Sequence, residues 1–159
     1  MTTSQATSLS AGDWYLPAGS QSAYSPTGLS NMQVTGRIEW GTAPSWLADA
    51  VTRVQHLRSL CEGWDGYGSS PVDRRLASAV VRFLSGPLWV ATPRPRITPT
   101  VDGGLAVEWR GARATLELEF DPRGAVDVYV SDSEGTEWEG TLGEEPDGLD
   151  KWAWRVARE

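Results

Sequence analysis

The stretch LAVEWRGARATLELEFDPRGAVDVYV, residues 105–130, decides the fold of this chain. Apolar and polar residues alternate through three runs of it, and turn residues at Gly111 and from Asp121 to Gly124 separate these runs. A period of two is the pattern of a β-strand with one buried and one solvated face, and such short breaks are typical of hairpins. The stretch therefore predicts three consecutive antiparallel strands.

Similar runs extend the predicted sheet in both directions. A run at 96–100 precedes an Asp-Gly-Gly turn, and a run at 137–142 follows a Ser-Glu-Gly turn, so we expect a five-stranded antiparallel meander. The apolar face of this sheet comprises Leu105, Val107, Trp109, Leu116, Leu118, Phe120, Val126, Val128 and Val130. The opposite face carries Glu108, Glu117, Glu119, Asp127, Tyr129, Glu137 and Glu139.

A first helix is predicted between residues 45 and 61, where apolar residues recur every three or four positions. Ser45 is its expected N-cap, and Gly63 is placed to end it. Cys61 falls on the apolar stripe, so we expect it in the core, whereas His56 falls on the helix surface.

A second helix is predicted between residues 70 and 85. Ser70 is its expected N-cap, Pro71 occupies the first helical position, and Asp73 completes a capping box. Gly86 and the proline after it end this helix.

Two helices before a meander with one apolar face predict an α+β fold, with both helices packed on one face of the sheet. We expect residues 1–31 to form a flexible or draped arm and residues 32–159 to form a single domain, with a first edge strand at 32–40. Residues 149–158 fit a short terminal helix. This basic, Trp-bearing tail is expected to pack on its own domain, and insertion into another subunit is the alternative.

Composition limits the class of protein. The chain has 159 residues, enough for one domain with a core, and no apolar run of the roughly 18–20 residues that cross a bilayer. The N-terminus lacks the basic start and apolar stretch of a secretory signal. Cys61 is the single cysteine, which excludes an intrachain disulfide and a multi-cysteine zinc site. We expect a cytoplasmic protein without membrane attachment.

Charge is divided unevenly along the chain. Residues 102–150 hold 14 acidic and three basic residues, a local net charge of −11, whereas the whole chain carries −7. A surplus of acid argues against direct nucleic-acid binding, because phosphate contacts need Lys and Arg. An acidic sheet face could steer and dock a basic protein, it could imitate DNA phosphates, or it could serve only as a solvated surface.

The segment EGWDGYGSSP, residues 62–71, joins the two predicted helices. Its glycines permit a positive φ, Asp65 can accept hydrogen bonds from backbone amides, and Trp64 and Tyr67 are expected to pin the loop to the core. Alternatively, Trp64, Asp65 and Tyr67 line a site for a cationic ligand, a peptide or a protein partner.

The same residues carry a resemblance. The chain is similar to small bacterial proteins with a GWDGYG-x-x-P signature followed by a P-x-I-x-P-x-x-D-G-G hairpin, which here begins at Pro95. The likeness spans roughly residues 54–130. It implies a shared domain and supplies no chemistry.

No convincing catalytic constellation emerges. His56 and Cys61 are five positions apart on one helix and project in different directions. We expect no metal and no cofactor. Glu117 and Glu119 share one sheet face, but an open face does not exclude water. The rival hypothesis is a carboxylate enzyme, metal-assisted if needed, around Asp65, Glu108 and Glu117.

These observations favour a non-catalytic module that binds a basic protein through the acidic sheet face or through the Trp64–Tyr67 loop. Inhibitors, antitoxins, immunity proteins and accessory subunits of defence systems share this profile, which is an association by class. A DNA-mimic inhibitor and a phage structural component stay as alternatives, and self-association stays open.

Overall fold

The computed structural model describes residues 43–158. The predicted arm at 1–31 and the predicted strand at 32–40 lie outside these residues. The elements are α1 (Leu47–Arg58), α2 (Arg74–Leu84), a short 3-10 helix η1 (Pro87–Trp89), β1 (Arg96–Pro99), β2 (Leu105–Arg110), β3 (Ala114–Phe120), β4 (Val126–Asp132), β5 (Glu137–Thr141) and α3 (Leu149–Ala157).

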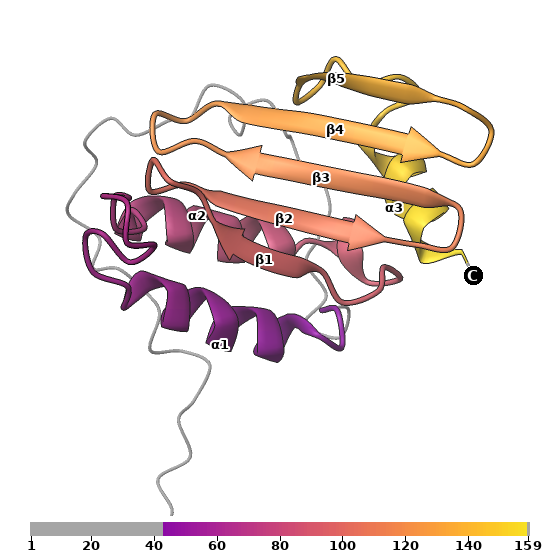
Figure 1. The fold of residues 1–159 in the computed structure, drawn as a ribbon. Helices are drawn as coiled ribbons and strands as arrows, with labels where there is room; N and C mark the ends of the chain where they lie inside the picture. Colours follow the sequence, from indigo (N-terminus) through magenta and orange to yellow (C-terminus); the bar gives the residue numbers. More distant parts are fainter. Residues whose placement is uncertain (1–42, 159) are drawn as a thin grey trace, which may run out of the picture.

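The five strands form one antiparallel meander in the order β1-β2-β3-β4-β5, which confirms the predicted α+β class (Figure 1). Burial alternates along β3 and β4, and every predicted apolar-face residue of β2, β3 and β4 is buried. The helices pack against that same apolar face, because their buried side chains join those of the sheet in one hydrophobic cluster. The helices of the described residues 43–158 therefore cover one face of the sheet and leave the other uncovered.

The start of α2 differs from the prediction. Asp73, not Ser70, is the N-cap, and its carboxylate accepts hydrogen bonds from the amides of Arg75 and Leu76, both at 2.8 Å. Ser70 does not cap the helix, because its amide donates to the carbonyl of Val101 and so holds it against the turn between β1 and β2. A contact between segments distant in sequence thus overrides a local capping signal.

Both ends of α1 also differ from the prediction. Trp46 occupies the N-cap position without a side-chain cap, and its indole Nε1 instead donates to the carbonyl of Thr92 at 2.9 Å. The helix ends at Arg58, before Gly63. Cys61 therefore lies beyond the helix and is exposed, so its predicted core position is wrong.

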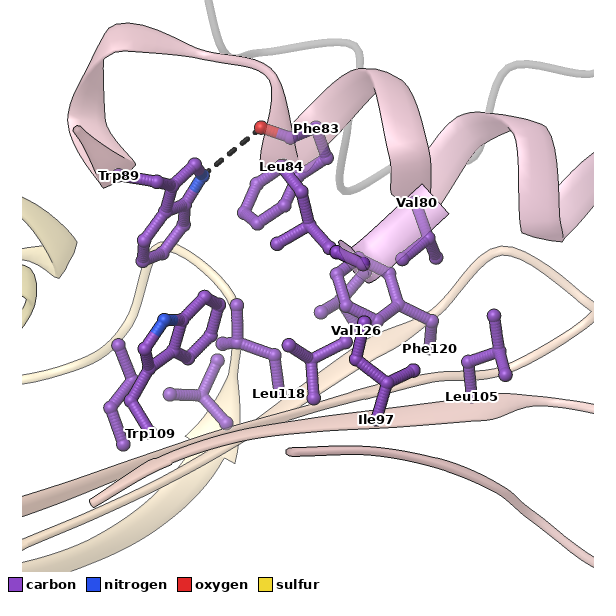
Figure 2. Close-up of a cluster of buried hydrophobic side chains, with 14 of the residues drawn as sticks. Val80, Phe83, Leu84, Trp89, Ile97, Leu105, Trp109, Leu118, Phe120 and Val126 are labelled. Carbon is purple, nitrogen blue, oxygen red and sulfur yellow. Dashed lines mark hydrogen bonds between the residues drawn. The ribbon is translucent and has the colours of Figure 1, made fainter. Parts of the chain in front are cut away.

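An aromatic stack joins η1 to the sheet (Figure 2). The rings of Trp89 and Trp109 are nearly parallel, with centroids 4.4 Å apart, and both side chains are fully buried. Trp89 Nε1 donates to the carbonyl of Phe83 at 3.0 Å, which ties the stack to the end of α2. Phe83 in turn packs edge-on against Phe120 of β3. These contacts hold α2 against the centre of the sheet.

The C-terminal segment forms a helix and packs on its own domain, as predicted. Trp152 of α3 is fully buried, and its Nε1 donates to the carbonyl of Pro146. Arg155 lies over the Trp152 ring and pairs with Asp132 and Asp147, at 3.3 and 3.0 Å. Its guanidinium thereby links α3 to the end of β4.

The aromatic stack generates a stability prediction. Trp109→Ala removes a buried ring and leaves a cavity beside Trp89, so we expect a loss of about 3–5 kcal/mol in the free energy of unfolding. The matched control is Trp154→Ala, because Trp154 is 54% exposed. This control should cost less than about 1 kcal/mol. Urea unfolding of both variants measures the difference, and similar losses would contradict the assigned core.

Candidate functional site

The strand register places the predicted acidic residues in rows across the uncovered side of the sheet. Glu108 of β2 pairs with Glu117 of β3, which pairs with Tyr129 of β4, which pairs with Glu139 of β5. Directly paired side chains of neighbouring strands lie about 4.5–5.5 Å apart at Cβ. One continuous row therefore crosses four strands.

The remaining acidic residues lie beside this row. Glu119 pairs with Asp127, and Glu137 pairs with Ser131, on the same side of the sheet. The register thus brings all the predicted residues of this face together, and we call this surface the open face. It comprises Glu108, Glu117, Glu119, Asp127, Tyr129, Glu137 and Glu139.

The charges of the open face are only partly compensated. Arg110 lies 2.6 Å from the Glu108 carboxylate, and Arg96 lies 4.0 Å from it. Tyr129 donates its hydroxyl proton to Glu137 at 3.1 Å. The other carboxylates of this face form no ion pair with any residue in the described range 43–158, and they are Glu117, Glu119, Asp127, Glu137 and Glu139.

The surroundings of Glu117 shift the pKa of its carboxyl. Partial burial raises the pKa of its carboxyl above the ordinary value, and the negative charges of Glu108 and Glu119 raise it further. Arg110 and Arg96 act in the opposite direction but do not cancel the effect. Ionised Glu117 is therefore unfavourable in the folded protein.

The loop between α1 and α2 is a separate and well-braced feature. Asp65 Oδ1 accepts hydrogen bonds from the amides of Tyr67 and Ser69, at 2.8 and 3.2 Å. Trp64 Nε1 donates to the carbonyl of Ser70 at 3.2 Å. Gly66 has a φ of 83°, a conformation that favours glycine. The predicted Asp65 turn is confirmed, and we call residues 62–71 the GWDGYG loop.

Tyr67 does not pin this loop to the core, contrary to the prediction. Its side chain is 94% exposed, whereas Trp64 is half-buried against the loop. The two amide hydrogen bonds of Asp65 turn the chain so that Tyr67 projects from it. The neighbouring Ser69 hydroxyl and the amides of Tyr67 and Ser69 lower the pKa of Asp65, so the turn is held by a carboxylate at neutral pH.

The residues of the rival enzyme hypothesis do not form one cluster. Glu108 and Glu117 are neighbours on the open face. Asp65 belongs to the GWDGYG loop, where Ser70 contacts the turn between β1 and β2. Within residues 43–158, no group of three His, Cys, Asp or Glu side chains is placed to hold a metal ion. His56 is exposed on α1, as predicted.

Sequence reasoning missed a groove between α1 and β1. Its walls include Arg53 of α1 and the segment around Arg94 and Arg96. The repeated Pro-Arg of residues 93–96 could have drawn attention to it, since prolines fix the backbone from which the arginines project. The third arginine, Arg53, is distant in the sequence and joins the other two only in the folded chain.

Comparison of the chain with family models, with curated proteins and with solved structures finds no match. No helix within residues 43–158 combines the length and apolar character needed to cross a membrane.

The raised pKa of Glu117 gives a pH-dependent prediction. Glu117→Gln should increase the free energy of unfolding at pH 7 by roughly 0.5 kcal/mol, because it removes a charge that partial burial and the neighbouring carboxylates disfavour, an effect that solvent partly screens. A raised folded pKa means that wild-type Glu117 takes up a proton as the pH falls, which relieves the same repulsion. The advantage of the variant should therefore shrink at acidic pH.

Urea unfolding between pH 7 and pH 4 measures this effect. Glu144→Gln is the control, because it removes one charge from the exposed connection between β5 and α3. A variant that loses stability at pH 7, or whose gain does not depend on pH, would contradict the assigned repulsion.

Proposed function

We propose that this chain is a non-catalytic protein-binding module whose open face docks a basic protein. The observation that carries this proposal is the row of carboxylates on a sheet face that no helix within residues 43–158 covers. Like charges on neighbouring strands weaken a sheet, so this arrangement has a stability cost. A basic partner would remove that cost on binding, because its Lys and Arg side chains would pair with the open carboxylates.

Electrostatics determines what kind of binding this surface supports. Exposed charges of one sign attract an oppositely charged partner from a distance and raise the association rate. They contribute less to the lifetime of the complex, because solvent and salt screen them. We therefore expect association that slows strongly as salt increases.

The GWDGYG loop supports a second contact in the same function. Tyr is enriched among the residues that dominate protein interfaces. Here the Asp65 turn and the Trp64 hydrogen bond fix the backbone on both sides of Tyr67. A rigid support lowers the entropy lost on binding, so an exposed ring on it is a suitable anchor.

The biological class remains a proposal by association. An inhibitor, antitoxin, immunity protein or defence-accessory subunit would each use an acidic surface to occupy a basic partner. A DNA mimic is the variant of this function in which the partner's own ligand is nucleic acid. Competition with duplex DNA for the captured protein distinguishes that case.

The open face is tested with substitutions that remove the charge of a side chain and keep its size. A tagged wild-type protein is used to capture partners from source-cell extract at 50 and 500 mM salt, beside two variants of equal charge. The face variant combines Glu117→Gln, Glu119→Gln and Asp127→Asn. The control combines Glu62→Gln, Glu134→Gln and Glu144→Gln, all exposed positions outside the open face.

We expect a basic protein that binds the wild type and the control at low salt and dissociates at high salt. The face variant should bind it at least tenfold more weakly, measured with the purified partner, because several charge contacts are lost together. Equal affinity of the two variants would exclude the open face as the docking surface.

The loop is tested separately with Tyr67→Ala. Since the side chain is 94% exposed, its removal should change the free energy of unfolding by no more than about 0.5 kcal/mol. If Tyr67 anchors the partner, affinity should fall about tenfold or more. Trp154→Ala is the matched control, since it also removes an exposed aromatic ring. Unchanged affinity in Tyr67→Ala would show that the loop makes no such contact.

A further inference from the structure

An open groove of about 400 Å³ runs between α1 and the edge strand β1. Its volume lies in the range of small-ligand sites. The residues that line it come from one side of α1 and from the start of the sheet, and they are Asp49, Ala50, Arg53, Arg94, Pro95, Arg96, Ile97 and Thr98.

Two polar contacts cross this groove. Arg94 pairs with Asp49 at 3.1 Å, and Arg53 Nε donates to the carbonyl of Ile97 at 3.1 Å. Ala50 and Ile97 are buried and close the groove on its inner side. The groove therefore has an apolar inner wall, with Arg53 on one side and Arg94 on the other.

Strand geometry places a backbone donor in the same space. The amide of Thr100 donates to the carbonyl of Gly104 on the β2 side. Backbone groups alternate in direction along a strand, so the N–H and C=O of Thr98 face β2 and those of Ile97 face away from it. The Arg53 contact confirms this, because the Ile97 carbonyl faces α1. The amide of Ile97 points to the same free edge. Outside the sheet ladder, this N–H has no hydrogen-bond partner in the described part of the chain.

This edge does not suit an added strand. A pairing strand needs donors at alternate positions, which here are residues 95, 97 and 99. Two of them are proline, Pro95 and Pro99, and have no N–H to donate. Ile97 therefore offers a single donor, which suits one oxygen atom of a small ligand.

The charge of the groove is positive, in contrast to the open face. Three arginines and one carboxylate line it. Arg53 uses only its Nε, so its terminal nitrogens make no hydrogen bond to another residue within 43–158. Arg96 pairs with Glu108 on the open face, at 4.0 Å, so Arg53 and Arg94 supply the positive charge of the groove.

We propose that this groove binds a small organic anion through a carboxylate or phosphate group. The Ile97 amide and the terminal nitrogens of Arg53 donate to its oxygens, and Arg94 joins them from the opposite side. Guanidinium groups match the planar or tetrahedral geometry of these anions and bind them by paired hydrogen bonds. Asp49 competes with the ligand for Arg94 and thus limits the affinity.

This site is independent of the proposed protein-binding function. Its ligand is negatively charged and meets α1 and β1, whereas the open face attracts positive charge over β2 to β5. Loss of one activity therefore leaves the other to be measured.

An NMR titration of the full chain tests the site directly. Sodium phosphate and sodium succinate are the two probes, and sodium chloride at matched ionic strength is the reference. The amide resonance of Ile97 and the Nε–H resonance of Arg53 should move and saturate with at least one probe. The probe that binds more tightly identifies phosphate or carboxylate as the preferred group. Equal shifts with chloride, or no saturable shift with either probe, would overturn the proposal.

Two substitutions in the groove should change the affinity for the preferred probe in opposite directions. Arg94→Gln should weaken the binding of the preferred probe about tenfold, because it removes a charged donor. Asp49→Asn should strengthen binding several-fold, because it removes the competing carboxylate and releases Arg94. Arg82→Gln on α2 is the control, since it removes the same charge outside the groove. An unchanged Kd in Asp49→Asn would contradict the site. So would a loss of affinity in Arg82→Gln equal to that in Arg94→Gln.

Discussion

The fold depends on one constraint, which is that only one face of the five-stranded sheet can be buried. The two stacked indoles of Trp89 and Trp109 show how that burial is achieved, since they connect the end of α2 through η1 to the middle of the sheet. α3 completes the same core from the other end of the chain through Trp152. The helices within residues 43–158 pack on this face, and strand alternation places the polar residues on the opposite face in rows set by the register.

The two charged surfaces follow from the positions of the elements. The open face spans β2 to β5, where most of the side chains that alternate with the buried apolar ones are acidic. The groove lies at the first edge strand, where prolines and Arg53 close the edge to further pairing. The same devices that protect an edge strand from aggregation thus leave one amide and several guanidinium groups available. A net-acidic chain therefore carries a local site for anions beside a surface for cations.

Much of the sheet and its faces could be predicted because a period of two is a local property of the sequence. The acidic rows followed from the same alternation, since adjacent hairpins leave little freedom of register. Contacts between distant segments could not be predicted. Ser70 loses its capping role to a hydrogen bond with Val101, Cys61 is exposed because α1 ends early, and the groove forms only when α1 meets β1. The exposure of Tyr67 likewise depends on how the Asp65 turn directs the chain.

In the proposed complex, the partner lies on the open face. Zero-length cross-linking of carboxylates to lysine amines in the purified complex, followed by mass spectrometry of the linked peptides, tests it most directly. We expect partner lysines to be linked to Glu117, Glu119 and Asp127, on the central strands β3 and β4. Links confined to acidic residues outside the open face, such as Glu62 and Glu134, would contradict it.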